Sequence, residues 1–138
     1  MMAKRKQSAK SQAGRLRIVA GNWRSRLLEI AHVEGLRPTS ERIRETLFNW
    51  LAPQIHGAHC LDLYAGTGAL GLEALSRGAA SAVFVEVSRV AAQQLRINID
   101  LLKAEKATVL QQDALEYLYS KPDEKFDIVF LDPPFAAD

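Results

Sequence analysis

The sequence predicts an α/β fold in which a parallel sheet is covered by helices on both faces. From residue 59 onward, short apolar runs alternate with helix-like segments, and the runs are nearly continuous in the way that doubly covered parallel strands are. The chain has 138 residues, 48% hydrophobic and 25% charged, which suits one globular domain with a buried core. The residues before this alternation follow another pattern, which predicts a β-hairpin and a helix ahead of the sheet.

The chain is basic at its N-terminal end and acidic in the rest. Residues 1–44 contain 11 Lys and Arg and 3 Asp and Glu, whereas residues 45–138 contain 7 and 13. This asymmetry indicates a polyanionic partner such as nucleic acid, although a solvated tail would carry the same charges. No apolar run approaches the roughly 20 residues that span a bilayer, so we expect no membrane contact.

The thiol and the imidazoles are assigned no chemistry. The single cysteine, Cys60, lies in an apolar strand context and is interpreted as a core residue. A chain with one cysteine cannot form an internal disulfide, which fits a reducing cytoplasm. The three histidines, His32, His56 and His59, lack the spacing of metal ligands. We therefore expect no metal site.

The N-terminal elements are a tail and a hairpin. Residues 1–14 are small, polar and basic, which predicts disorder. Residues 15–30 predict a β-hairpin with Gly21-Asn22 as its turn, because apolar side chains alternate along the first strand at Leu16, Ile18 and Ala20.

Arginines recur at matching spacing along this predicted hairpin: Arg15 and Arg17 on one strand, Arg24 and Arg26 on the other. With Trp23 near the tip, they can contact RNA phosphates and stack on a base. A small flap with solvated arginines is an equally good interpretation, and the segment alone does not decide between them.

A helix is predicted over residues 36–52. Pro38 helps to set its start, Thr39 or Ser40 can cap it, and Pro53 is expected to end it. One apolar stripe is expected to face the core, at Ile43, Leu47, Trp50 and Leu51. The arginines near its start are surface charges or phosphate ligands: Arg37, Arg42 and Arg44.

The remaining residues predict four strands joined by helices. The strands are expected at residues 59–64, 81–87, 107–111 and 126–131, and the helices at 67–77, 88–103 and 114–120. Gly78 is expected to end the first of these helices and Ser88 to cap the second. One face of that second helix is apolar, at Ala91, Leu95, Ile99 and Leu102.

Each predicted strand is followed by a motif suited to ligand binding. In an open parallel sheet the ligand lies beyond the carboxyl ends of the strands, at the point where the strand order reverses. The motifs are Gly66-x-Gly68-x-x-Gly71 after the first strand, Glu86 near the end of the second, Gln112-Asp113 after the third and Asp132-Pro133-Pro134-Phe135 after the fourth. Their convergence on one edge is stronger evidence than any one of them.

The glycine loop fits NAD and S-adenosylmethionine (SAM) equally well. Gly66 and Gly68 permit close approach of a ligand, and Glu86 follows at the distance that suits a carboxylate on ribose hydroxyls. Asp62, inside the apolar strand, favours SAM, because a buried carboxylate needs compensation that a cationic ligand or the amides of the loop can supply. An anionic pyrophosphate would be repelled there.

The Asp132-Pro133-Pro134-Phe135 tetrad favours SAM as well. Its prolines stiffen the loop, and because they have no backbone N–H, the loop offers carbonyl acceptors and few donors. Asp132 adds a carboxylate acceptor, and Phe135 adds an aromatic ring. Such a set can accept from the exocyclic amine of a base, stack on the base, and favour a pyramidal nitrogen whose lone pair attacks a sulfonium methyl in line. The plain alternative is a strand-ending turn with an aromatic core residue.

Asp113 has two compatible interpretations. It can cap the following helix, and it can accept a hydrogen bond from adenine while the Ala114 amide reaches a ring nitrogen. The predicted cofactor-binding residues are therefore Asp62, Tyr64, Gly66, Gly68, Glu86, Asp113 and Ala114.

Four runs of the sequence resemble the RsmD family, the 16S ribosomal RNA guanine-N2 methyltransferases of bacteria: RPTSERIRETLFNWL, CLDLYAGTGALGLEALSRGA, FVEVS and DIVFLDPPF. The resemblance covers residues 15–135 and implies a Rossmann-like, class I SAM-dependent methyltransferase fold. It implies methyl transfer from SAM to the N2 atom of one guanine in 16S rRNA, within the 30S subunit or its assembly intermediate. In that family the residues matching the glycine loop, Glu86 and Asp113 bind SAM, and those matching Asp132 to Phe135 hold the guanine.

The resemblance also implies a division of the chain. Residues 1–14 form the tail, 15–53 contact RNA and cover the cofactor, with Arg15, Arg17, Arg24, Arg26, Arg37 and Arg42 as RNA ligands, and 54–138 bind SAM. Family members continue past the tetrad with further strands, whereas the sequence ends at Asp138. We therefore expect a fragment that lacks the C-terminal strands and is itself inactive.

Other functions stay open on the residues alone. A DNA adenine-N6 methyltransferase would use a similar tetrad, and the block at residues 37–51 argues against it by resemblance only. An NAD-dependent oxidoreductase is disfavoured by Asp62 and by the tetrad. A non-catalytic RNA-binding protein would rely on the basic hairpin. We expect a cytoplasmic monomer.

Overall fold

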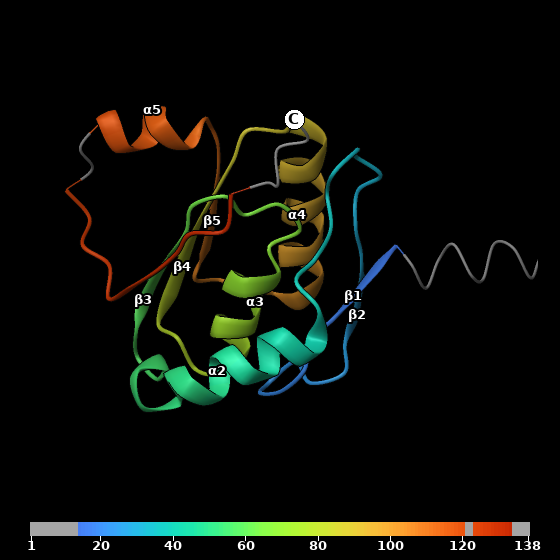
Figure 1. Ribbon diagram of the computed structural model, residues 1–138, viewed down its shortest axis with the longest axis vertical. Helices are drawn as coiled ribbons and strands as arrows, with labels where there is room; N and C mark the ends of the chain where they lie inside the picture. Colours follow the sequence, from blue (N-terminus) through green and yellow to red (C-terminus); the bar gives the residue numbers. More distant parts are fainter. Residues whose placement is uncertain (1–13, 121–122, 134–138) are drawn as a thin grey trace, which may run out of the picture.

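The computed structural model describes residues 14–120 and 123–133, coloured along the chain in Figure 1. Its elements in chain order are β1 (Arg15–Arg17), β2 (Leu27–Glu29), α2 (Glu41–Ile55), β3 (His59–Asp62), α3 (Ala69–Ser76), β4 (Ser81–Glu86), α4 (Arg89–Leu102), β5 (Ala107–Gln111), α5 (Ala114–Tyr119) and β6 (Ile128–Phe130). None of the helices within these ranges is long and apolar enough to cross a membrane.

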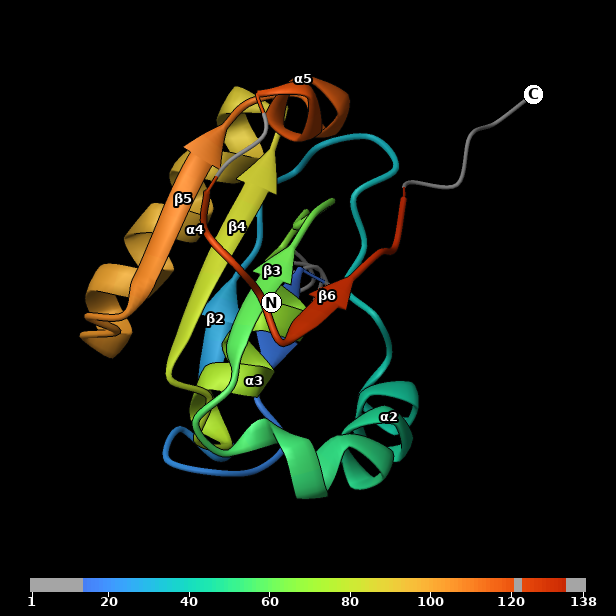
Figure 2. The ribbon, with the colours of Figure 1, turned by 90° about the vertical axis from the view of Figure 1, so that its left-hand side faces the viewer.

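The central sheet has four strands in the order β5-β4-β3-β6, and all neighbouring pairs are parallel (Figure 2). The strand order reverses at β3, since β4 and β5 follow on one side of it and β6 returns to the other. Asp62, the last residue of β3, lies opposite Phe84 of β4 and Phe130 of β6. The predicted parallel sheet is confirmed, and its reversal point lies beside Asp62.

Helices cover both faces of this sheet. In Figure 1 the α2, α3 and α4 helices and the hairpin lie on one face, and α5 lies on the other. The larger core cluster contains Cys60, Phe84 and Leu95 on the first face, and the smaller one contains Val83 and Tyr117 on the second. Cys60 is fully buried, as predicted, and burial raises the pKa of its thiol to about 11, so the thiol stays protonated.

The helices of the sheet begin close to the predicted positions. Ser88 caps α4 by accepting from the Ala91 amide, and Asp113 caps α5 by accepting from the Leu115 and Glu116 amides. The α3 helix begins at Ala69, because Gly68 takes the N-cap position with a φ of 83°. The Ser88 and Asp113 side chains satisfy amides that a helix leaves without internal partners.

The hairpin differs from the predicted one in its turn. It closes at Ile18, whose amide donates to the Arg26 carbonyl and whose carbonyl accepts from the Ser25 amide, so residues 19–24 form a loop. The strands are therefore short, and Arg24 and Arg26 do not lie on the return strand, which corrects the expected spacing. Gly21 is needed because a Cβ there would lie 2.0 Å from the Ser76 carbonyl oxygen of α3.

The α2 helix also corrects two expectations. Ser40 caps it, but it continues through Pro53 to Ile55 instead of ending before the proline. The expected apolar stripe is wrong in part, since Ile43 and Trp50 are 60% and 76% exposed. The buried face is Arg44, Phe48 and Ile55, and the pattern missed it because a charged residue takes one of the core positions.

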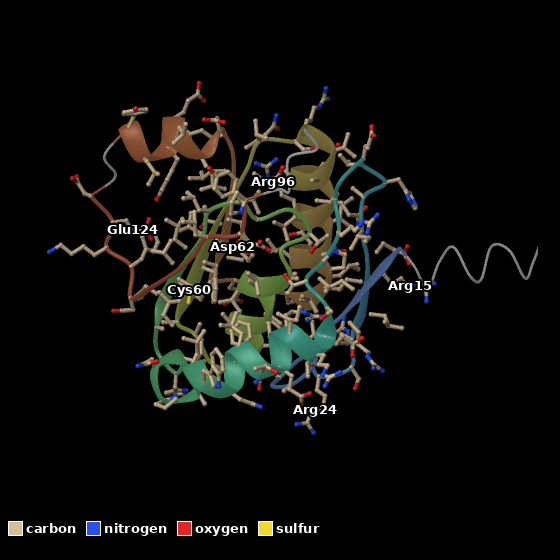
Figure 3. All side chains as sticks on the ribbon, in the orientation of Figure 1. Arg15, Arg24, Cys60, Asp62, Arg96 and Glu124 are labelled. Atoms are coloured by element: carbon tan, nitrogen blue, oxygen red, sulfur yellow. The ribbon has the colours of Figure 1, made fainter. Side chains whose placement is uncertain are left out.

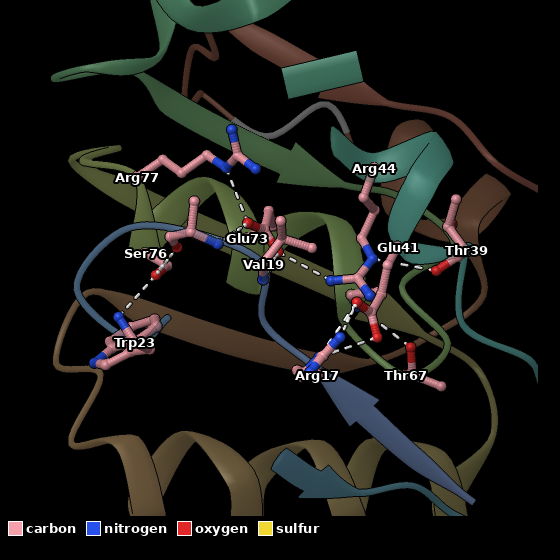
Figure 4. A network of polar contacts seen from close by, with 12 residues as sticks. Arg17, Val19, Trp23, Thr39, Glu41, Arg44, Thr67, Glu73, Ser76 and Arg77 are labelled. Carbon is pink, nitrogen blue, oxygen red and sulfur yellow. Dashed lines mark hydrogen bonds and ion pairs between the residues drawn. The ribbon is translucent and has the colours of Figure 1, made fainter. Parts of the chain in front are cut away.

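That charged residue belongs to a buried network around Glu73 of α3, shown in Figure 4. The Glu73 side chain is 0% exposed and accepts from Arg44 Nη1 and Arg77 Nε, both at 2.9 Å. Its two oxygens also accept from the backbone amides of Val19 and Ala20 in the hairpin loop, each at 3.0 Å. One carboxylate thus joins α3, α2 and the hairpin with four charge-assisted or amide hydrogen bonds.

Neighbouring contacts extend this network. The Ser76 hydroxyl accepts from the Trp23 amide and donates to the Ala20 carbonyl. The Arg44 Nε donates to the Thr39 carbonyl, and the Arg77 guanidinium lies 5.2 Å from the centre of the Phe48 ring. On the far side of the hairpin, the buried Asn98 of α4 donates to the Glu29 carbonyl at 2.8 Å. The hairpin is therefore fastened to α3 and α4.

We predict that Glu73→Gln lowers the free energy of unfolding by about 3 kcal/mol or more, because it leaves the buried Arg44 charge without compensation. Glu45→Gln is the matched control, since Glu45 is exposed on α2, and it should change stability by less than about 0.5 kcal/mol. Denaturant unfolding of both variants measures the difference. Equal effects of the two substitutions would contradict the role given to Glu73.

Candidate functional site

A cavity of about 580 Å³ opens at the carboxyl ends of the strands. Its wall is built from the residues that follow all four strands of the central sheet, together with residues 33–37 and Thr39 of the connection between β2 and α2. The structure therefore brings together most of the predicted site residues: Asp62, Tyr64, Gly66, Glu86, Asp113, Ala114, Asp132 and Pro133.

Asp62 lies at the base of this cavity and is 2% exposed, near the middle of the molecule in Figure 3. One of its oxygens, Oδ2, accepts from the Gly71 amide at 3.0 Å. Burial raises the pKa of Asp62 to about 7, the Gly71 hydrogen bond opposes the shift, and the nearby Asp132 and Glu86 carboxylates add to it. A cation in the cavity would favour the ionised form of this group.

Glu86 holds the glycine loop in place. Its Oε1 accepts from the Gly66 amide at 2.7 Å and its Oε2 accepts from the Ser88 amide at 2.9 Å. Each carboxylate oxygen can accept more than one hydrogen bond, so both keep capacity for ligand hydroxyls.

Asp113 caps the α5 helix, which is one of the two roles that the sequence predicts for it; the other is contact with a ligand. Its Oδ2 accepts from the Leu115 amide at 3.0 Å and from the Glu116 amide at 3.3 Å. Asp113 and Ala114 both line the cavity, so the cap and contact with a ligand are geometrically compatible. Adenine recognition by these residues stays a prediction.

The acceptor motif is described in part. Asp132 and Pro133 follow β6 and line the same cavity as the glycine loop. Pro134 and Phe135 lie outside the described residues. Asp132 is exposed, so its carboxylate is accessible to a ligand that enters the cavity.

Two of the glycines serve packing. Gly68 is absent from the residues that line the cavity, and a Cβ there would lie 2.4 Å from Leu95 Cδ1 of α4. Gly71 packs on β4, where a Cβ would lie 2.3 Å from Phe84 Cε2. A role of Gly68 in cofactor binding stays a prediction, and its observed role is to let α3 and α4 approach each other.

Residue-by-residue reasoning did not find the wall formed by the connection between β2 and α2. Leu36 lies against Gly66, since a Cβ on that glycine would be 3.1 Å from Leu36 Cδ1, and Glu34, Arg37 and Thr39 also face the cavity. The Arg37-Pro38-Thr39-Ser40 run signals an extended entry into a helix. Nothing local in that run indicates which surface the segment covers.

The predicted RNA-binding arginines have different surroundings. Arg15 pairs with Glu29 at 3.1 Å and Arg17 pairs with Glu41 at 2.9 Å. The other four take part in none of the ion pairs between described residues: Arg24, Arg26, Arg37 and Arg42. Arg24 projects at the periphery in Figure 3, whereas Arg37 is the one that lines the cavity. RNA contact by these side chains stays a prediction.

The charge of the cavity wall fits a cationic ligand. Five carboxylates line it, from Glu34, Asp62, Glu86, Asp113 and Asp132, and Arg37 is the one basic side chain among the described lining residues. A pyrophosphate would meet mostly like charge here, whereas a sulfonium and an ammonium would meet opposite charge. The residues present therefore fit SAM better than NAD.

Comparisons with known proteins agree with this fold. The model of the family described as "Conserved hypothetical protein 95" matches residues 16–138. The chain is 50% identical to the Ribosomal RNA small subunit methyltransferase D of Haemophilus influenzae over 125 residues, and 53% identical to the protein of that name from Escherichia coli K12 over 125 residues. These alignments cover 88% and 91% of this chain but 65% and 63% of the relatives, so the chain spans slightly less than two thirds of their length.

A solved Escherichia coli structure, provisionally described as the methyltransferase yhhF, superposes with a TM-score of 0.77 at 52% identity. It is covered over 67% of its length by 88% of this chain. The structure of the hypothetical protein TTHA0928 from Thermus thermophilus has a TM-score of 0.76 at 32% identity, with 89% of this chain and 71% of that chain covered.

We predict that Asp62 makes stability fall as pH rises from about 4 to about 7. In this window the unfolded chain has lost the Asp62 proton and the folded protein keeps it, so the unfolded state binds fewer protons. The unfolding free energy of the native protein, relative to Asp62→Asn, should fall by at most about 1.4 kcal/mol per pH unit there and level off above pH 7. Denaturant titrations at a series of pH values measure it.

The control for this prediction is Asp100→Asn, since Asp100 is exposed on α4 and does not line the cavity. A stability difference between the native protein and Asp62→Asn that is independent of pH would show that Asp62 is ionised in the folded state at all these pH values.

Proposed function

The chain belongs to the family described as "Conserved hypothetical protein 95", the RsmD family, and from this premise we propose that the protein is a SAM-dependent methyltransferase acting on small-subunit ribosomal RNA. The acceptor is the exocyclic N2 of a guanine in 16S rRNA, presented in the 30S subunit or an assembly intermediate. The names of the relatives from Haemophilus influenzae and Escherichia coli support the RNA substrate and the reaction. The resemblance of the Asp132-Pro133 motif supports the amine acceptor.

One observation carries the proposal. The glycine loop and the Asp132-Pro133 motif, separated by more than sixty positions in the sequence, line one cavity at the reversal point of the sheet. A methyltransferase needs its donor and acceptor sites to meet so that the two substrates react in line. Neither the hairpin alone nor a dinucleotide site explains why an oxygen-rich acceptor motif faces the glycine loop.

The cofactor is SAM, held by the residues after the first three strands of the sheet. Glu86 offers carboxylate oxygens to the ribose hydroxyls, and Asp113 with the Ala114 amide receives the adenine. Tyr64 and Gly66 form the adjoining wall, and the ionised Asp62 behind them stabilises positive charge in the cavity. When bound, SAM supplies an electrophilic methyl group on a positively charged sulfur.

The acceptor is held by the residues after β6. The Asp132 carboxylate and the Pro133 carbonyl accept from the guanine amine, and these hydrogen bonds orient the nitrogen and favour the pyramidal form with an available lone pair. The amine gains positive charge as it is methylated, so an adjacent carboxylate stabilises the transition state. Asp132 is accessible enough to receive the proton that the nitrogen then releases.

We propose the following setting for this reaction. A base in a paired region would have to be extruded to reach the cavity. With ribosomal RNA as its proposed substrate, we propose that the protein acts in the cytoplasm. Action as a monomer stays a prediction.

We predict that Asp132→Ala reduces methyl transfer at least about 100-fold while SAM affinity changes only severalfold, because the partner of Asp132 is the acceptor amine. Radiolabelled transfer by the full-length protein onto unmodified 30S particles, with naked 16S rRNA and DNA alongside, measures the first effect, and calorimetry of the full-length protein with SAM measures the second. Asp123→Ala, at an exposed position away from the cavity, is the control. Loss of SAM binding in Asp132→Ala would assign that residue to the cofactor, and transfer to DNA in preference to rRNA would overturn the substrate.

We also predict that Arg24 and Arg26 contribute more to RNA binding than Arg15 and Arg17 do. Replacing Arg24 and Arg26 by Gln should reduce the slope of log affinity against log salt by about 0.7 to 0.9 for each phosphate that the variant no longer neutralises. The same change at Arg15 and Arg17 should have a smaller effect, since Glu29 and Glu41 already neutralise these charges. Fluorescence anisotropy with a labelled rRNA fragment measures both slopes. Unchanged slopes in both double variants would exclude the hairpin from RNA binding.

A further inference from the structure

The acidic cavity wall suits the two positive charges of SAM, but SAM also carries one negative group that needs a partner. The methionine part of SAM carries a carboxylate besides its ammonium and sulfonium. Five carboxyl groups line the cavity, and each of them would repel that group when it is ionised. Arg37 is the one basic side chain among the described lining residues, so a carboxylate in this cavity has one evident partner.

Arg37 is available to a ligand. It takes part in none of the ion pairs between described residues, in contrast to Arg17, whose guanidinium is held by Glu41 at 2.9 Å. Its side chain is exposed at the edge of the cavity, so it meets a ligand without first losing a protein partner. A guanidinium can bind a carboxylate through two parallel hydrogen bonds, which makes arginine well suited to this task.

The backbone around Arg37 is held on both sides. On one side the Leu36 amide donates to the Val33 carbonyl at 2.9 Å, and the Leu36 side chain lies against Gly66 of the glycine loop. On the other side Pro38 restricts the Arg37 backbone, and the Thr39 carbonyl accepts from Arg44 Nε at 3.1 Å. Arg44 is itself fixed by the buried Glu73, so the segment that carries Arg37 is anchored to the core.

We propose that Arg37 binds the carboxylate of the methionine part of SAM and thereby makes the site specific for the amino-acid form of the cofactor. The inference rests on the proposed function, because it names a contact within the same cavity. It assigns to the connection between β2 and α2 a direct share in cofactor selection. An RNA phosphate is the competing partner for the same guanidinium, and the test separates the two.

The test compares SAM with decarboxylated SAM, which keeps the adenosine, the sulfonium and the amine and lacks the carboxylate. Calorimetry on the full-length protein should show that the native form binds SAM about tenfold or more tightly than the decarboxylated analogue. Arg37→Gln should weaken SAM about tenfold and leave the analogue within about twofold, so that the preference disappears. Arg37→Lys should keep part of it.

Arg42→Gln is the matched control, because Arg42 is exposed on the next helix, takes part in no ion pair among the described residues and does not line the cavity. It should leave both affinities unchanged. Equal losses for both ligands in Arg37→Gln, or no loss for either, would overturn the inference. So would a loss of rRNA affinity with unchanged SAM binding, which would give the guanidinium to a phosphate. A native protein that binds neither ligand would instead refute the proposed function itself.

Discussion

The carboxylate of Glu73 lies where α3, α2 and the hairpin loop meet, and it accepts hydrogen bonds from all three. A buried charge of this kind is stable only with full compensation, so Arg44, Arg77 and the two loop amides must be in place together. The consequence reaches the cavity, since Arg44 also holds the Thr39 carbonyl. The position of the wall formed by residues 33–37 and Thr39 therefore depends on a carboxylate in the core.

The central sheet positions the other walls of the cavity. Because β3 and β6 are neighbours and run in parallel, the residues that follow them end at the same edge of the sheet. The glycine loop and the Asp132-Pro133 motif meet there for that reason, and no other contact is needed to bring them together. Asp62, at the end of β3, lines the same cavity, and a cationic ligand there would favour its ionised form against the effect of burial.

Much of this arrangement could be predicted from the sequence, because it follows from local patterns. Parallel strands appear as apolar runs, and Ser88 and Asp113 are helix caps of a common kind. The errors arise where a distant charge decides the structure. Arg44 occupies a core position that an apolar pattern assigns to solvent, and Glu73, within a helical run, carries no local sign that it is buried. The conformation of the hairpin loop was missed for the same reason, because hydrogen bonds to Glu73 and Ser76 of α3 hold it instead of a two-residue turn at Gly21-Asn22.

The central claim is that an acid-lined cavity at the reversal point of the sheet holds a cationic methyl donor instead of an anionic dinucleotide. Calorimetric titration of the full-length protein with SAM and, separately, with NADH tests it most directly. We expect saturable heat from SAM and none from NADH. Tight binding of NADH with no heat from SAM would contradict the claim.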